Sequence, residues 1–70
     1  MTTTNQPTYT SYSVDVTYAD GRQPHRGFKT EAAARKYYDR MVADPKATRV
    51  LLFGYDADGT ADGIDGWWAE

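Results

Sequence analysis

Residues 12–18 alternate between apolar and polar side chains, which is the pattern of a β-strand with one buried face. The apolar members are aromatic or β-branched, and such side chains suit a pleated surface. They are Tyr12, Val14, Val16 and Tyr18. Asp20-Gly21 follows, and this pair is typical of a two-residue type I′ hairpin turn, whose central residues both take positive φ. The pattern therefore predicts a strand that turns back along itself.

Residues 22–28 form a weaker returning strand. Pro24 donates no backbone hydrogen bond, so we expect this strand at the edge of a sheet. Two registers are open. A two-residue loop leaves Phe28 on the wrong face unless a bulge forms at Gly27, whereas a three-residue loop with a bulge pairs Phe28 with Tyr12. Burying Phe28 contributes about 1.5–3 kcal/mol, which favours a bulged arrangement.

Residues 31–43 have the spacing of an amphipathic helix. One face carries Ala34, Tyr37, Tyr38, Met41 and Val42, and the opposite face carries Arg35, Lys36, Asp39 and Arg40. Thr30 is a favourable N-cap, and Glu31 places a negative charge at the positive end of the helix dipole. Pro45 disfavours helical geometry at the residue before it, so the helix should end near Ala43 after about thirteen residues.

Residues 48–55 are the most hydrophobic run and do not alternate, which is typical of a central strand or one covered on both faces. Asp58-Gly59 predicts a second tight hairpin, which leads into a last strand. With a two-residue loop, the expected pairs are Ile64 with Phe53, Trp67 with Val50, and Gly63 with Gly54. The element order is therefore β-β-α-β-β. It predicts an α+β fold, with a four-stranded, mostly antiparallel sheet and one helix packed on one face.

The predicted domain spans residues 10–70, and residues 1–9 are expected to be a mobile polar tail. One helix leaves the second face of the sheet open, although apolar side chains alternate onto both faces. Contiguous apolar patches that contain Trp, Tyr and Phe are typical of interfaces. We therefore expect a protein partner, either a second copy in a homodimer or a foreign protein, on this open face. The expected contact residues there are Leu51, Phe53, Tyr55, Ile64 and Trp68.

The composition of the 70 residues limits how the fold is stabilised. The chain has no cysteine, so neither a disulfide nor a thiolate-bound metal is available, and this suits a reducing cytoplasm. Ten aromatic residues must supply much of the buried surface. No apolar run approaches the ~20 residues of a membrane-spanning helix, and the polar start does not have the features of a signal peptide.

Charge is distributed unevenly along the chain. Residues 1–20 carry −2, residues 21–49 carry +5 and residues 50–70 carry −5, for a net charge of −2. Either the basic and acidic segments attract each other within the fold or simply face water, or the asymmetry steers a partner, in which case the helix cations Arg35, Lys36 and Arg40 are expected to take part in partner binding. An alternative is a nucleic-acid-associated protein that uses residues 22–49. The acidic pI of about 5.2 and the lack of an RNA-binding strand signature argue against it.

The candidate chemistry is sparse. His25 is the sole histidine, and the triad drawn from Ser13, His25 and Asp15 has no oxyanion hole, so we expect no enzyme activity. With a single histidine and no cysteine, zinc is not expected. The acidic residues 56–65 do not match the spacing of a calcium-binding EF-hand loop, and two Asp-Gly turns explain them instead. We therefore expect no cofactor and no metal.

The chain resembles, in format, the small accessory proteins of phages and mobile elements, among them anti-CRISPR and other anti-defence inhibitors. The features that carry this resemblance are the short length, the polar start MTTTNQP, the hairpin YSVDVTYADGR before FKTEAAARKYYDRM, and the aromatic end GWWAE. The resemblance implies stoichiometric binding to a host protein complex, such as a defence nuclease, with its DNA or partner site blocked.

Overall fold

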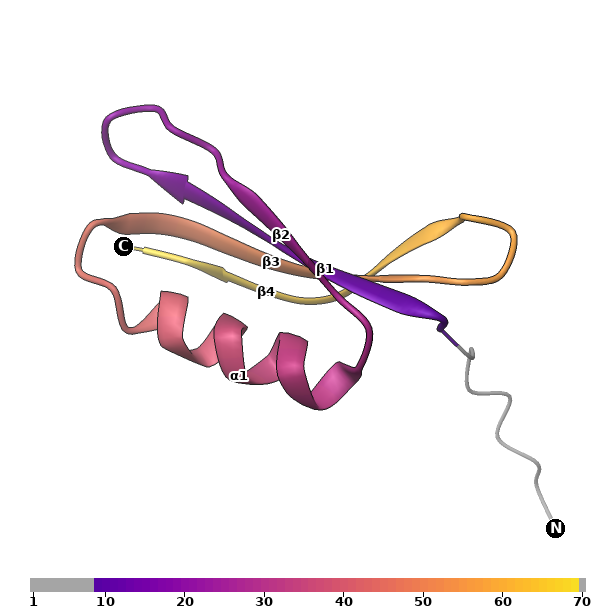
Figure 1. The fold of residues 1–70 in the computed structure, drawn as a ribbon. Helices are drawn as coiled ribbons and strands as arrows, with labels where there is room; N and C mark the ends of the chain where they lie inside the picture. The colour runs from indigo at the N-terminus through magenta and orange to yellow at the C-terminus, as the bar shows by residue number, and fades with distance from the viewer. Residues whose placement is uncertain (1–8, 70) are drawn as a thin grey trace, which may run out of the picture.

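A computed structural model of the chain describes residues 9–69 (Figure 1). Four strands, β1 (Ser11–Tyr18), β2 (His25–Phe28), β3 (Ala47–Tyr55) and β4 (Ala61–Trp68), form one antiparallel sheet in the order β2-β1-β3-β4. The helix α1 (Glu31–Val42) lies across one face of this sheet, as Figure 1 shows. The predicted α+β fold with the order β-β-α-β-β is therefore confirmed, and so is the edge position of β2.

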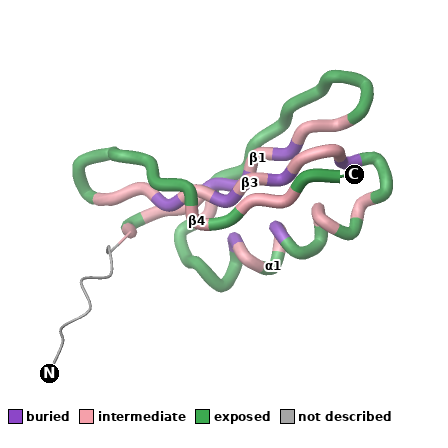
Figure 2. The backbone as a smooth tube through the Cα atoms, turned by 180° about the vertical axis from the view of Figure 1, so that it is seen from behind, coloured by how far each residue is buried: buried purple, intermediate pink, exposed green. Residues whose placement is uncertain are grey.

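The core lies between α1 and the two central strands. In β1 and β3, Val14 pairs with Leu52 and Val16 with Val50, and all four side chains are inaccessible to solvent or nearly so. Ala34, Tyr38 and Ala47 complete the buried cluster. Figure 2 shows the buried positions on the central strands and on the side of α1 that faces them. The alternation in β1 produces this core, because every second side chain of a strand points to the same face.

The helix follows the capping signals of the sequence. The Thr30 hydroxyl accepts a hydrogen bond from the Ala33 backbone N–H at 3.2 Å, and Ala43 is the C-cap. The predicted helix is confirmed, with its end one residue earlier than expected. Tyr38 is the only aromatic side chain of α1 that is buried, because Tyr37 lies toward the side of the stripe that faces the edge strand β2. Within residues 9–69, no helix combines the length and apolar character needed to cross a membrane.

Both hairpins use a three-residue Ala-Asp-Gly loop. The three-residue alternative left open at Asp20-Gly21 is therefore the one that forms, whereas the two-residue turn expected at Asp58-Gly59 is wrong. Only the glycines, Gly21 and Gly59, have positive φ, at 95° and 83°. In the first loop, the Tyr18 N–H bonds the Arg22 carbonyl at 2.8 Å, and the Gly21 N–H bonds the Tyr18 carbonyl at 2.9 Å. This is the pattern of a three-residue hairpin loop whose last residue, a glycine with positive φ, forms a G1 bulge. It selects the register in which Tyr12 pairs with Phe28.

The β3–β4 register contains a second correction. Val50 pairs with Trp67 as predicted, but Phe53 pairs with Gly63 instead of Ile64, and Gly54 pairs with Asp62. The three-residue loop shifts the first pairs by one position. An irregularity between Leu52 and Phe53, which leaves Ile64 as an extra residue on β4, restores the expected register beyond it.

Tyr9 extends the helix-facing side of the sheet. Its ring packs edge-on against Tyr12 with 5.9 Å between the ring centroids, and its hydroxyl donates to Asp62 Oδ2 at 3.3 Å. A Cβ on Gly54 would lie 2.6 Å from this ring, so the ring occupies the space that a side chain would need. Tyr9 belongs to the predicted tail of residues 1–9, and the other eight residues of that tail lie outside the described residues.

We predict that Gly21→Ala lowers the free energy of unfolding by about 1–2 kcal/mol, because alanine tolerates left-handed backbone poorly. Gly27→Ala is the matched control, since its φ is not positive and an added Cβ meets no atom closer than 3.9 Å. We expect that control to change stability by less than about 0.5 kcal/mol. Urea unfolding followed by far-UV circular dichroism measures both. Equal stability of the two variants would contradict the loop geometry.

Candidate interaction surface

The open face of the sheet is formed by the residues that alternate with the core positions. Val14 and Val16 point toward α1, so Ser13, Asp15 and Thr17 of β1 point away from it. On β3 the corresponding side chains are Leu51, Phe53 and Tyr55, all half-buried. Trp68 of β4 pairs with Arg49 on the same face and is 62% exposed, the most exposed large apolar side chain among residues 9–69. The face that the helix does not cover therefore retains accessible apolar side chains.

The apolar part of this open face forms a shallow hollow of about 290 Å³ along β3 and β4. Its walls include Leu51, Phe53, Ile64 and Trp68. A Cβ on Gly66 would lie 3.0 Å from the Trp68 ring and 3.2 Å from the Leu51 side chain. The tryptophan ring therefore lies across Gly66 and beside Leu51, and the missing side chain at Gly66 makes this position possible.

The residues at the far end of the open face are more polar. Ser13 is only 7% exposed, and its hydroxyl lies 3.0 Å from the Tyr55 hydroxyl. Tyr55 thus leans from β3 over β1 and covers part of the sheet. The accessible apolar surface is concentrated near Leu51, Phe53 and Trp68 as a result.

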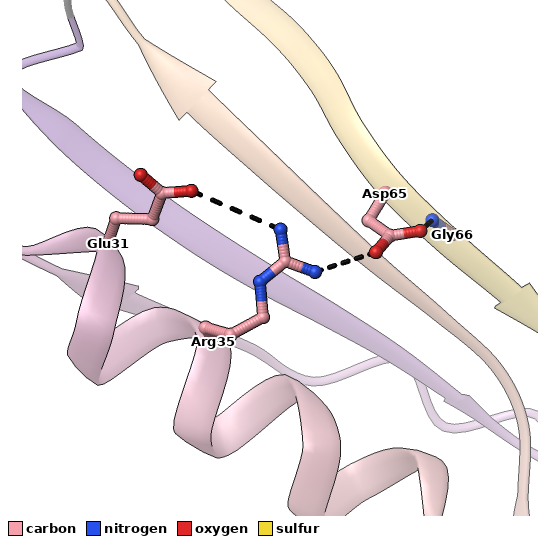
Figure 3. A network of polar contacts seen from close by, with 4 residues as sticks. All are labelled: Glu31, Arg35, Asp65 and Gly66. Carbon is pink, nitrogen blue, oxygen red and sulfur yellow. Dashed lines mark hydrogen bonds and ion pairs between the residues drawn. The ribbon is translucent and has the colours of Figure 1, made fainter.

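Arg35 lies on the helix side and joins α1 to β4 (Figure 3). Its Nη1 donates to Asp65 Oδ2 at 2.6 Å, and its Nη2 lies 4.0 Å from Glu31 Oε2, one turn earlier in the helix. Asp65 also accepts from the Gly66 N–H at 2.8 Å. The bond from Arg35 and then the bond from Gly66 lower the pKa of the Asp65 carboxyl. The guanidinium of Arg35 is therefore paired with carboxylates of the same chain.

The other two helix cations predicted to bind a partner, Lys36 and Arg40, lie beside the edge strand β2. With Arg26, Phe28 and Tyr37 they surround a second hollow of about 260 Å³ between β2 and α1. The structure thus divides the predicted contact residues between two opposite faces of the molecule. Sequence analysis missed the grouping with Arg26 and Phe28, because it depends on how β2 crosses the helix. The available signal was the helical spacing of the residues Ala33, Lys36, Tyr37 and Arg40.

The acidic turn and the lone histidine lie in different parts of the sheet. The Asp56 carboxylate accepts hydrogen bonds from the N–H groups of Asp58 and Thr60, so it stabilises the β3–β4 loop. His25 pairs across the strands with Asp15. In the described part of the chain, no three His, Cys, Asp or Glu residues are grouped so that they could hold a metal ion.

No protein-family model, no curated protein and no solved structure matches the chain at a significant level.

We predict that Gly66→Ala displaces the Trp68 ring, because the added Cβ would be in close contact with that ring and with Leu51. Since Trp68 is at the end of an edge strand, the ring can move outward, and acrylamide should then quench the tryptophan fluorescence more strongly. Gly63→Ala is the matched control, since its Cβ would meet Phe53 at an ordinary 4.0 Å. Identical quenching in both variants would mean that Gly66 does not define the position of Trp68.

We predict that Asp65→Asn reduces stability at pH 7 by about 1 kcal/mol or less, because the side chain is 45% exposed and solvent weakens the pair. The folded pKa of Asp65 is lowered, so its contribution is complete above the unfolded pKa of about 3.9 and is lost as the pH falls through the folded pKa. The wild-type and Asn proteins should therefore converge in acid, as measured by urea unfolding from pH 7 to pH 2. Asp39→Asn breaks no ion pair among residues 9–69 and should show no such convergence. A gap that stays constant with pH would contradict the Arg35–Asp65 bond.

Proposed function

We propose that this chain is a non-enzymatic protein-binding module that docks a foreign protein on the open face of its sheet. The observation that carries this proposal is the exposed Trp68 ring beside the hollow formed with Leu51 and Phe53. Tryptophan is over-represented among the residues that dominate binding energy at interfaces. Its position across Gly66 restricts the ring before a partner arrives, which reduces the entropy lost on binding.

The chemistry of the surface defines the partner that would fit. A bulky apolar side chain of the partner would enter the hollow between Phe53 and Trp68. Asp15 and Arg49 lie on the same face, and neither makes an ion pair among residues 9–69. They would orient a partner that offers an opposite charge to each, with an apolar group between them.

The resemblance to phage and mobile-element accessory proteins suggests a finer version of the proposal. In that version the partner is a bacterial defence complex of the CRISPR–Cas type, and the chain inhibits it stoichiometrically in the bacterial cytoplasm. The small size and the exposed Trp68 ring support an inhibitor that acts by occupying a site. Expression of the chain should then raise the plaque count of a phage targeted by CRISPR–Cas, whereas a Trp68→Ala variant should not.

Nucleic-acid association is the second candidate function. The observation in its favour is the group of Arg26, Lys36 and Arg40, which have no carboxylate within ion-pair distance among residues 9–69. Of the remaining cations, Arg22 and Arg35 are paired with aspartates and Arg49 is on the open face, so these three do not extend the group into a continuous track. The open face is therefore the better-supported docking surface.

The test compares wild-type protein with Trp68→Ala, using Lys46→Ala as the control on a surface away from the hollow. We expect one partner to be captured from bacterial lysate by the wild-type and Lys46→Ala proteins. The Trp68→Ala variant should bind the purified partner about 30-fold more weakly, equivalent to about 2 kcal/mol, in biolayer interferometry.

Two results would contradict the proposal. One is a captured partner whose affinity is the same for the Trp68→Ala and wild-type proteins. The other is a wild-type homodimer in light scattering that Trp68→Ala converts to a monomer, because a second copy would then occupy the face.

A further inference from the structure

The hollow between β2 and α1 combines three positive charges with an aromatic wall. Arg26 and Phe28 come from the helix-facing side of the edge strand, and Lys36, Tyr37 and Arg40 come from α1. The Phe28 and Tyr37 rings lie 5.4 Å apart between centroids, at an interplanar angle of 43°. The Arg26 guanidinium carbon lies 5.6 Å from the Phe28 centroid and 5.3 Å from the Tyr37 centroid. The rings therefore hold one cation at the wall of the hollow.

The charges around this hollow are not balanced within the described chain. No carboxylate lies within 4.0 Å of Arg26, Lys36 or Arg40 in residues 9–69. Of the acidic residues of the helix, Glu31 lies beside Arg35 and Asp39 is exposed to solvent. Lys36 and Arg40 are one helical turn apart, where like charges repel and weaken an isolated helix. Arginine pairs readily with oxyanions through two parallel hydrogen bonds, so this arrangement suits an anion.

We propose that this hollow binds a small phosphorylated aromatic molecule of the nucleoside monophosphate class. The phosphate would lie among Arg26, Lys36 and Arg40, and the planar ring would rest against the apolar side chains of Phe28, Ala33 and Tyr37. A phosphate carries up to two negative charges at neutral pH and so neutralises more of the cluster than a single carboxylate does. A volume of about 260 Å³ is enough to accommodate one such molecule.

The placement of the other cations also favours a small ligand over a nucleic-acid strand. Arg22 is paired with Asp20 at 2.8 Å and Arg35 with Asp65 at 2.6 Å, so a phosphate backbone would have to compete with these carboxylates for both arginines. Arg49 lies on the opposite face of the sheet. The site is also separate from the Trp68 surface, so the proposed nucleotide binding does not depend on the proposed function.

The test is an NMR titration of the ¹⁵N-labelled full chain with three probes: AMP, adenosine and inorganic phosphate. AMP should shift the amide resonances of Arg26, Phe28, Lys36, Tyr37 and Arg40, with a Kd no weaker than about 1 mM. Adenosine and phosphate should each bind at least about tenfold more weakly, because each supplies only part of the contact.

Two variants make the test specific. The Lys36→Gln/Arg40→Gln double variant keeps helix-forming side chains at exposed positions and should weaken AMP binding about tenfold or more. Trp68→Ala should leave AMP binding unchanged, since it alters only the open face.

Three results would overturn the proposal. The first is no shift of these resonances at 10 mM AMP, a concentration about tenfold above the expected Kd. The second is that inorganic phosphate binds as tightly as AMP, because the aromatic wall would then contribute nothing. The third is that an oligothymidylate binds more tightly than AMP, with shifts that spread beyond the hollow and affinity that rises with strand length. That pattern would indicate a nucleic-acid surface instead.

Discussion

The packing of one helix against the two central strands determines the rest of the molecule. Val14, Val16, Val50 and Leu52 form a continuous apolar strip, and Ala34 and Tyr38 of the helix cover it. A chain of 70 residues offers little other interior, because small domains bury a limited share of their surface. The small side chain of Ala34 lets the helix approach the sheet closely, and the larger Tyr38 fills the space beside it. With α1 packed on this side, residues 9–69 cover one face of the sheet and leave the other to solvent.

This constraint explains why the two candidate surfaces differ in character. The open face receives the side chains that alternate with the core, and on β3 these include Leu51 and Phe53 because residues 50–53 are apolar without a break. On the helix side, Tyr37 lies at the edge of the apolar stripe of α1 and next to the edge strand β2. The long basic side chains of Arg26, Lys36 and Arg40 surround it. One surface therefore suits an apolar protein contact, and the other suits a charged ligand.

Strictly local patterns were predictable from the sequence. The alternation in β1, the Thr30 cap, the Pro45 stop and the edge position of the strand that follows Pro24 all depend on neighbouring residues, and each is found where it was expected. The loop length was left open at Asp20-Gly21 and predicted wrongly at Asp58-Gly59, because an Asp-Gly pair is compatible with both a two-residue turn and a three-residue turn. Choosing between them depends on where Phe28 can be buried, which is a tertiary effect.

The candidate sites were only partly predictable for the same reason. The open-face residues of β3 follow from strand alternation, so Leu51, Phe53 and Tyr55 were placed together correctly. The charged hollow needs Arg26 of β2 beside Lys36 and Arg40 of α1, and nothing in the local sequence specifies that crossing. Arg35 was grouped with its helix neighbours because it is basic, whereas its bond to Asp65 depends on the position of β4 relative to the helix.

The extra residue at Ile64 affects how this molecule meets its own copies. β4 is an outer strand, and a long, regular outer strand exposes a row of backbone N–H and C=O groups to which another chain can add. The irregularity at Ile64 interrupts that row near its middle. The unpaired edge is thereby divided into two shorter stretches, which makes strand addition by another copy of the chain less favourable.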